Sequence, residues 1–260
     1  MNYKPNISVI IPTYNEDKYI KDALIAVKQQ KCDLTYEVIV VDGQSTDNTV
    51  PISENYAKVY NSPKKGKAFQ LNYGISKTSG DLVIFLDADT VIPPDFFQRI
   101  YQIFKTRENL FACSTRVNYY NGKVISFKIA SKRFIFTQYF ILNFNMHVFY
   151  LLKSLLGYPE LAGCNIIVRR EILLKTGGFK SPPNSLGIDK VFSDSLIYLT
   201  RKMKKGKVRT LNFMSVLTSG RHLTIKRSYK RVNQYILQKD IYYELAKKDE
   251  LASISQQNTT

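Results

Sequence analysis

The chain has 260 residues, of which 44% are hydrophobic and 23% are charged. This balance excludes an intrinsically disordered protein and is typical of one large domain, or of a domain with an appendage. The net charge of +17 is distributed unevenly: residues 1–100 contain 11 Lys and Arg against 12 Asp and Glu, whereas residues 101–260 contain 27 against 9. The basic second part predicts a negatively charged partner, such as nucleic acid, an anionic membrane surface or a phosphorylated substrate.

Short apolar runs alternate with helical patterns through the first part of the chain. The runs at 7–12, 36–42 and 82–86 predict strands, and the spacing at 19–30 and 67–76 predicts helices. This alternation predicts an α/β fold, with a doubly wound, mostly parallel sheet flanked by helices. Neither a Gly-x-Gly-x-x-Gly fingerprint nor a P-loop motif follows the first strand, which excludes nucleotide sites of those two kinds.

The apolar run at 82–86 ends in two carboxylates, in the sequence Asp87-Ala88-Asp89. Burying a bare carboxylate costs much free energy, so we expect both acids where the strand leaves the core. Ligands of parallel sheets bind just outside the carboxyl ends of the strands, and two carboxylates there can hold a divalent cation and, through it, a diphosphate. The simpler alternative is an acidic turn, because Asp-x-Asp is a common tripeptide.

The second part of the chain continues the pattern of strands and helices. Further strands are expected at 110–120, 162–170 and 208–217, and a helix at 191–204, which places a single domain over 1–225. A basic helical extension is expected over 226–260, because residues 229–248 have a polar helical pattern. The three cysteines, Cys32, Cys113 and Cys164, form no metal or redox pattern and predict thiols in a reducing compartment.

An aromatic segment over 129–157 interrupts this pattern. Residues 134–152 contain no charged side chain, yet Asn143, Asn145 and His147 make the stretch unsuited to a membrane span. Two interpretations stay open. The segment is a helix or helix pair that lies in a membrane interface between Arg133 and Lys153, or it packs on the sheet or against another subunit.

A series of short motifs occurs in order along the first 220 residues. They are Val-Ile-Ile-Pro-Thr-Tyr-Asn-Glu at 9–16, Val-Val-Asp-Gly-Gln-Ser-Thr-Asp at 40–47, Gly-Lys-Ala at 66–68, Asn-Tyr-Gly-Ile at 72–75, Asp-Ala-Asp at 87–89, the Gly163 turn, Gly-Gly-Phe at 177–179 and Asp194. In this order the motifs resemble those of the family 2 glycosyltransferases, which have the GT-A fold. The resemblance implies a metal-dependent, inverting, hexosyltransferase-like enzyme with a nucleoside-diphosphate sugar as donor. It also divides the domain into a nucleotide-sugar-binding half, 1–100, and an acceptor half, 101–225.

The resemblance also implies roles for particular residues. Base, ribose and phosphate of the donor are expected at Pro12, Tyr14, Glu16, Asp42, Lys67 and Asp87. Asp89 is expected to bind Mg²⁺ or Mn²⁺, and His222 is a second candidate ligand.

The remaining assignments concern the acceptor. Asp194 is expected to act as the general base, although Ser193 stands where the family has Glu. Residues expected to face the acceptor or a phosphate are Gly163, Arg169, Arg170 and Arg221.

A membrane-associated acceptor explains the basic second part and the aromatic segment together. Lipid-linked glycans, polyprenyl phosphate and polysaccharides are all candidates, with an anionic membrane surface as a further partner and no nucleic acid. Because the first residues lead directly into a strand without a signal peptide, we expect a cytoplasmic protein held peripherally at the membrane.

Two other classes of protein compete with this interpretation. A basic protein that binds nucleic acid or anionic membrane on a nucleotide-binding scaffold, without catalysis, would leave the acids at the strand ends without a role. A nucleotidyltransferase also uses paired acids and a metal, but would be expected to carry a basic Gly-rich loop after the first strand.

Overall fold

The computed structural model describes residues 4–120, 124–129, 132–137, 139–181 and 187–221. The chain divides into two compact units, 1–219 and 220–260, and the helices and strands described below all belong to the first. The expected extension, 226–260, lies outside the described residues. Over the part of the chain that is described, no helix is both long enough and apolar enough to cross a membrane.

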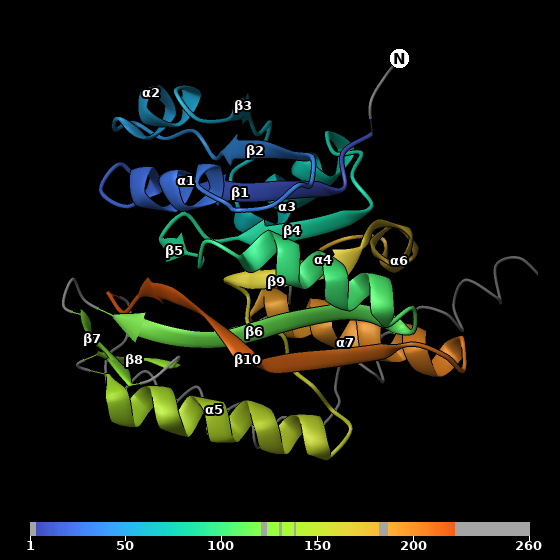
Figure 1. The fold of residues 1–260 in the computed structure, drawn as a ribbon. Helices are drawn as coiled ribbons and strands as arrows, with labels where there is room; N and C mark the ends of the chain where they lie inside the picture. The colour runs from blue at the N-terminus through green and yellow to red at the C-terminus, as the bar shows by residue number, and fades with distance from the viewer. Residues whose placement is uncertain (1–3, 121–123, 130–131, 138, 182–186, 222–260) are drawn as a thin grey trace, which may run out of the picture. The chain divides into compact units, whose positions relative to one another are not determined.

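An eight-stranded sheet forms the centre of the first unit (Figure 1). Its strands, in the order in which they lie side by side, are β3 (Lys58–Asn61), β2 (Tyr36–Asp42), β1 (Ile7–Thr13), β4 (Leu82–Leu86), β9 (Asn165–Arg169), β6 (Leu110–Tyr120), β10 (Lys207–Ser219) and β5 (Thr90–Val91). β9 runs antiparallel to both of its neighbours, and β5 runs antiparallel to β10, whereas the other neighbouring pairs are parallel. The predicted doubly wound, mostly parallel sheet is therefore confirmed.

Helices cover both faces of this sheet. In chain order they are α1 (Ile20–Lys28), α2 (Thr49–Glu54), α3 (Lys67–Ser76), α4 (Phe96–Thr106), α5 (Phe140–Leu155), α6 (Arg170–Thr176) and α7 (Ile188–Lys202). Large buried apolar residues of α1 and α4 belong to one hydrophobic cluster, and buried apolar residues of α3, α6 and α7 belong to a second on the other face. The sheet is therefore buried on both sides, which explains why its central strands are nearly continuous apolar runs.

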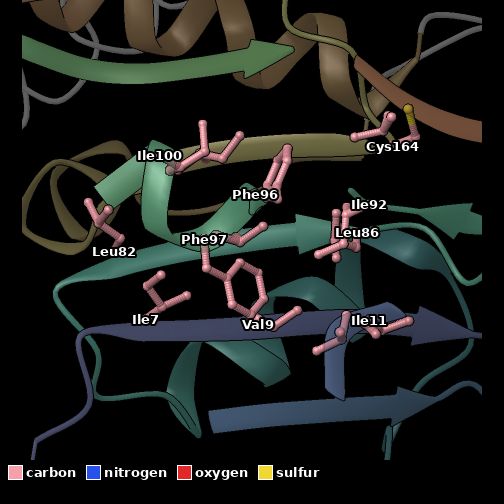
Figure 2. Packing of buried hydrophobic residues seen from close by; sticks show 14 of the residues in the cluster. Ile7, Val9, Ile11, Leu82, Leu86, Ile92, Phe96, Phe97, Ile100 and Cys164 are labelled. Atoms are coloured by element: carbon pink, nitrogen blue, oxygen red, sulfur yellow. The ribbon is translucent and has the colours of Figure 1, made fainter. Parts of the chain in front are cut away.

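The alternation of side chains along β1 shows how the two clusters share one strand. Ile7, Val9 and Ile11 belong to the cluster with α1 and α4, whereas Ile10 belongs to the cluster with α3. In Figure 2, the Val9 side chain and the Phe97 ring of α4 point toward one another. Successive residues of a strand face opposite sides, so a strand needs apolar residues at every position when helices cover both faces.

The aromatic segment is not one continuous helix. Its first part, Lys132–Thr137, forms strand β8 and pairs antiparallel with β7 (Val124–Ile129) in a separate hairpin. The expected helix begins only at Phe140. The aromatic and β-branched residues that alternate over 134–137, Phe-Ile-Phe-Thr, favour a strand. The prediction of a helix did not take this alternation into account.

Candidate active site

Loops from three adjacent strands meet at the carboxyl edge of the sheet. Thr13 ends β1 and lies opposite Asp42, which ends β2, and Ile10 of β1 lies opposite Phe85 of β4. This register brings the turn Asp87-Ala88-Asp89, which follows β4, level with the end of β1. The edge where ligands of parallel sheets bind therefore collects acids from two strands.

Asp42 is the centre of a hydrogen-bond network that joins the first two loops. Its carboxylate accepts hydrogen bonds from Thr13 Oγ1 (3.0 Å), from the Ser45 amide (2.8 Å) and from Ser45 Oγ (2.5 Å). Ser45 Oγ in turn accepts a hydrogen bond from the Asn15 amide at 2.9 Å. Only 1% of Asp42 is exposed, so its main role in this structure is to fix the loops on either side.

The backbone of these loops is unusual at two positions. Asn15 and Gln44 both have positive φ angles, 55° and 69°. Asn tolerates this left-handed region better than most residues, and the Asn15 side chain also accepts a hydrogen bond from the Thr46 amide at 2.8 Å. The adjacent Tyr14 is half exposed, and the Lys65 ammonium lies 5.3 Å from the centre of its ring.

Helix α3 holds the same two loops in place through the side chain of Gln70. The buried Gln70 amide donates hydrogen bonds to Thr13 O (2.6 Å) and to Val41 O (2.9 Å), at the ends of β1 and β2. A side chain at Gly43 would collide with this amide, because its Cβ would lie 2.8 Å from Gln70 Nε2. A side chain at Gly43 would therefore displace the Gln70 amide from its hydrogen bonds with Thr13 O and Val41 O.

Lys67, the first residue of α3, is paired with Asp87. Its ammonium lies 2.5 Å from the Asp87 carboxylate, and both side chains are partly exposed. Burial alone would lower the pKa of Lys67, but the carboxylate of Asp87, with a further contribution from Asp189, raises it. Lys67 is therefore held as a cation at the edge of the sheet.

Asp89 lies at the same edge but is more deeply buried, with 9% exposed. Its Oδ1 accepts a hydrogen bond from Thr218 Oγ1 of β10 at 3.1 Å, and Thr218 Oγ1 also accepts one from Thr90 Oγ1 at 3.0 Å. Among the described residues, no group of three or more His, Cys, Asp or Glu could hold a metal alone. One or two carboxylates suit a Mg²⁺-like ion that also binds substrate phosphates and water, and this donor set fits that kind of site.

Sequence reasoning missed Asp189, the second residue of α7. A Cβ atom at Gly163 would lie 2.9 Å from Asp189 Oδ2, so this acid packs directly against the Gly163 turn. The same turn is joined to the acidic motif, because the Asp87 amide donates a hydrogen bond to Cys164 O at 3.2 Å. Asp189 also lies close enough to Lys67, the partner of Asp87, to raise the pKa of that lysine. The sequence signal that could have identified Asp189 is its position in the first turn of α7, directly after Gly187.

Asp194, the expected base, lies more than one turn further along α7. Its carboxylate is paired with the Lys190 ammonium at an i, i+4 spacing, and both side chains are largely buried. Ser193, where the family has Glu, is fully buried, and its hydroxyl accepts a hydrogen bond from the Leu161 amide at 3.0 Å. Replacing this serine by Glu would place a carboxylate in the core.

Arg169 and Arg170 lie at the opposite end of the sheet from the acids. Arg169 pairs with Leu82, the first residue of β4, which is roughly 17 Å along the strand from Asp87. The Arg169 guanidinium donates hydrogen bonds to the carbonyls of Phe104, Arg107 and Leu110, and Arg170 donates one to Thr78 O. The structure thus gives both arginines backbone partners away from the candidate site.

The other expected residues are placed unequally. Pro12 is buried inside β1, and Glu16 lies in the loop that follows β1, where its amide donates a hydrogen bond to Thr49 Oγ1 at 2.7 Å. Arg221 belongs to the second unit, and His222 lies outside the described residues. The site as described therefore consists of Asp42, Lys67, Asp87, Asp89 and Asp189, with the loops that carry them.

Comparisons with known proteins identify glycosyltransferases as relatives of this chain. The chain is 31% identical to an uncharacterized glycosyltransferase, YfnE, of Bacillus subtilis (strain 168) over 112 residues, which are 41% of this chain and 29% of the relative. It is 29% identical to a dolichol-phosphate mannosyltransferase of Pyrococcus furiosus over 124 residues, 45% of this chain and 35% of that relative. The matched region thus spans about a third of the length of these curated relatives.

A solved structure matches over nearly the whole chain. The mannosyltransferase PcManGT from Pyrobaculum calidifontis, in complex with GDP-Man and Mn²⁺, has a TM-score of 0.64 and 22% identity, and the match covers 95% of this chain and 65% of that one. This likeness shows the fold, which is the GT-A fold that the motifs implied. The model of the family described as glycosyl transferase family 2 matches residues 8–176. The chain belongs to glycosyl transferase family 2.

Proposed function

We propose that this chain transfers a sugar from a nucleoside-diphosphate sugar to a glycan or lipid-linked acceptor, with inversion at the anomeric carbon. The observation that carries the proposal is the meeting of Lys67, Asp87 and Asp89 at the carboxyl edge of the sheet, next to the loops that Asp42 fixes. Anionic diphosphate binds readily at such an edge when a cation and a metal-binding carboxylate face it.

The donor half of the site follows from the loops after β1 and β2. Tyr14 presents an exposed ring for the base, and Glu16, next to it, supplies a carboxylate that accepts hydrogen bonds from a base N–H or from ribose hydroxyls. Pro12 and the buried Asp42 act as positioning residues, because they hold the backbone of these loops in place. Lys67 contacts the diphosphate after leaving its ion pair with Asp87.

Asp89 is the residue we propose as the metal ligand, with Asp87 on the ribose or on a metal-bound water. The relative PcManGT was solved with Mn²⁺ and a GDP sugar, which supports a divalent cation and a nucleotide-sugar donor in general. A divalent cation bound here would offset the negative charge that develops on the departing nucleoside diphosphate. His222 stays a proposed second ligand.

We propose Asp189, rather than Asp194, as the general base. Asp189 lies against Gly163 and close to Lys67, whereas Asp194 is paired with Lys190. The base takes the proton from the acceptor hydroxyl as its oxygen attacks the anomeric carbon, and the bond to the diphosphate breaks. A phosphate acceptor needs no base, because its oxygen is already anionic.

The first experiment tests the donor. The purified protein is incubated with a panel of UDP-, GDP- and dTDP-sugars, with Mn²⁺, with Mg²⁺ or with a chelator, and nucleoside diphosphate release is measured. We expect one donor to be hydrolysed slowly in the presence of metal and not with the chelator. Failure of every donor, with metal present and with no thermal stabilisation, would contradict the proposal.

The second experiment separates the two candidate bases. With a hydroxyl acceptor, Asp189→Asn is expected to lower kcat by a factor of about 10² to 10⁴ without weakening donor binding, and Asp194→Asn is expected to change kcat only a few-fold. With a polyprenyl phosphate acceptor, neither variant should lose turnover. A large loss confined to Asp194→Asn would restore the assignment that the motif order implied.

A further inference from the structure

Helix α5 directs two of its polar side chains, Asn143 and His147, toward the protein, whereas Asn145 is exposed. Asn143 is 6% exposed, accepts a hydrogen bond from the Tyr119 amide (2.9 Å) and donates one to Tyr119 O (3.3 Å). One turn later, His147 accepts a hydrogen bond from Arg116 (3.0 Å) and contacts Val117 O (3.2 Å). These contacts fix the rotation of the helix about its axis.

The reason for this orientation lies in β6. Its neighbour β9 pairs with it only over Ala112, Cys113 and Ser114, so the backbone of β6 beyond this point lacks that strand as a partner. Backbone N–H and C=O groups that are shielded from water need hydrogen-bond partners. The Asn143 side chain supplies an acceptor for the Tyr119 N–H and a donor for the Tyr119 carbonyl, in place of a neighbouring strand. Asn143 and His147 therefore bind the backbone of β6, where β9 no longer pairs with it.

The opposite face of α5 is consequently apolar and exposed. Ile141 and Leu155 are each 74% exposed. The exposed apolar side chains recur at helical spacing over the whole helix and its end: Phe140, Ile141, Phe144, Val148, Leu151, Leu152, Leu155 and Leu156. We call these residues the outer face of α5. Asn145 is the exposed polar residue among them, so this face is largely apolar. A largely apolar, exposed helical face marks an interaction surface.

Basic residues adjoin this surface. Tyr158, just beyond α5, lies under the Arg201 guanidinium, 5.0 Å from its ring centre. Arg201 begins a stretch in which Lys202, Lys204 and Lys205 are all exposed. An apolar helical face with cations close to its end is the pattern of a helix that lies in an anionic membrane interface.

We propose that the outer face of α5 docks this chain onto an anionic lipid bilayer, with the helix in the plane of the interface. A second copy of the chain is the main competing occupant. The net charge of +17 disfavours it, since two such chains repel one another, whereas the same charge is attracted to anionic headgroups. The proposal is independent of sugar transfer, because docking needs neither donor nor metal.

Vesicle co-sedimentation tests this without any substrate. The full chain is expected to bind vesicles of equimolar phosphatidylcholine and phosphatidylglycerol much better than vesicles of phosphatidylcholine alone. The double variant Ile141→Glu/Leu155→Glu should lower the partition coefficient at least about tenfold. Leu174→Glu is the matched control, because Leu174 is also an exposed leucine (56%) but lies on α6, and it should bind as the unmodified chain does.

The basic residues make a separate prediction within the same assay. Lys204→Gln/Lys205→Gln should weaken binding to the anionic vesicles by roughly fivefold for each lysine at low salt, and added salt should reduce this difference. Both sets of variants alter exposed side chains, so circular dichroism and thermal unfolding should stay unchanged.

Three results would overturn the proposal. One is equal vesicle binding by the Ile141→Glu/Leu155→Glu variant and the unmodified chain. Another is a dimer in sedimentation equilibrium that the double variant dissociates, with no vesicle binding by either protein. The last is a large loss of thermal stability in the double variant without vesicle binding by the unmodified chain, which would show that the chain itself covers this face.

Discussion

At the scale of single residues, the contacts of a side chain decide its role more than its chemical type does. Arg169 and Arg170 are adjacent cations, as in many phosphate-binding sites. The N–H groups of the Arg169 guanidinium nevertheless donate their hydrogen bonds to three backbone carbonyls of the same chain. Asp42 and Asp89 are both acids that follow or end strands, but Asp42 is closed in by Thr13 and Ser45. Asp89, in the turn after β4, is therefore the acid that we propose as the metal ligand.

His147 provides a test at this scale. The ring is half-buried next to Arg116, and burial together with this cation lowers the pKa of His147 to about 4. Between that value and the unfolded pKa of about 6.5, the unfolded chain binds more protons than the folded one, so folding stability falls as the pH is lowered.

The expected size of this effect is modest, because solvent reaches part of the ring. Between pH 7 and pH 4.5, we expect His147 to remove about 1–2 kcal/mol of unfolding free energy. His147→Gln cannot titrate and should lack this part of the pH dependence, which urea unfolding at several pH values would measure. Asn145→Gln, on the exposed side of α5, should behave as the unmodified chain does. Identical pH profiles for His147→Gln and the unmodified chain would contradict the assignment.

At the scale of the elements, helix ends and strand ends are held together by a few side chains. Gln70 of α3 joins β1 to β2, and Arg169 of β9 joins the end of α4 to the start of β6. In each case the backbone groups at an element's end have no partner within the element and need one from elsewhere. The Gln70 link holds the loops of the site, whereas the Arg169 link lies at the opposite end of the sheet.

Arg169→Met tests such a link. Removing the guanidinium leaves the carbonyls of Phe104 and Leu110 without their donor and should lower the unfolding free energy by about 2–3 kcal/mol. In the folded protein, kcat and the KM for the acceptor should stay unchanged. Chemical unfolding and steady-state kinetics measure the two quantities. Lys105→Met, which removes an exposed cation from α4, the helix whose end Arg169 contacts, is the control. A higher KM for the acceptor at unaltered stability would instead support contact of Arg169 with the acceptor.

At the scale of the whole molecule, one ligand should stabilise the entire first unit, because the site joins strands, α3 and α7. With Mn²⁺ and the nucleoside diphosphate of its donor at about 100 times their Kd, the unfolding free energy should rise by about 2.7 kcal/mol. Asp89→Asn should abolish the part of this increase that depends on metal, since it removes the proposed ligand and keeps an oxygen for Thr218. Differential scanning calorimetry measures the change.

Asp81→Asn is the matched control for this experiment. Asp81 precedes β4 and is paired with Lys4 at the other end of the strand from Asp89, so the variant should keep the whole metal-dependent increase. If Asp89→Asn kept the same increase, Asp89 would not be the metal ligand.

The sequence by itself determined the alternation of strands and helices and the acids at their ends. The helix expected at 67–76 coincides with α3, and Asp87 and Asp89 follow β4 as expected. Local patterns suffice here, because a doubly covered strand must be apolar throughout and a charge must lie where it leaves the core.

Only the tertiary structure decided which side chains meet. The contact of Asp189 with Gly163 brings α7 to the turn before β9, and the outward apolar face of α5 depends on where β9 stops pairing with β6. Both results come from residues far apart in the chain. Periodicity can show that a helix has two faces, but the hydrogen-bonding needs of a distant strand determine which face turns inward.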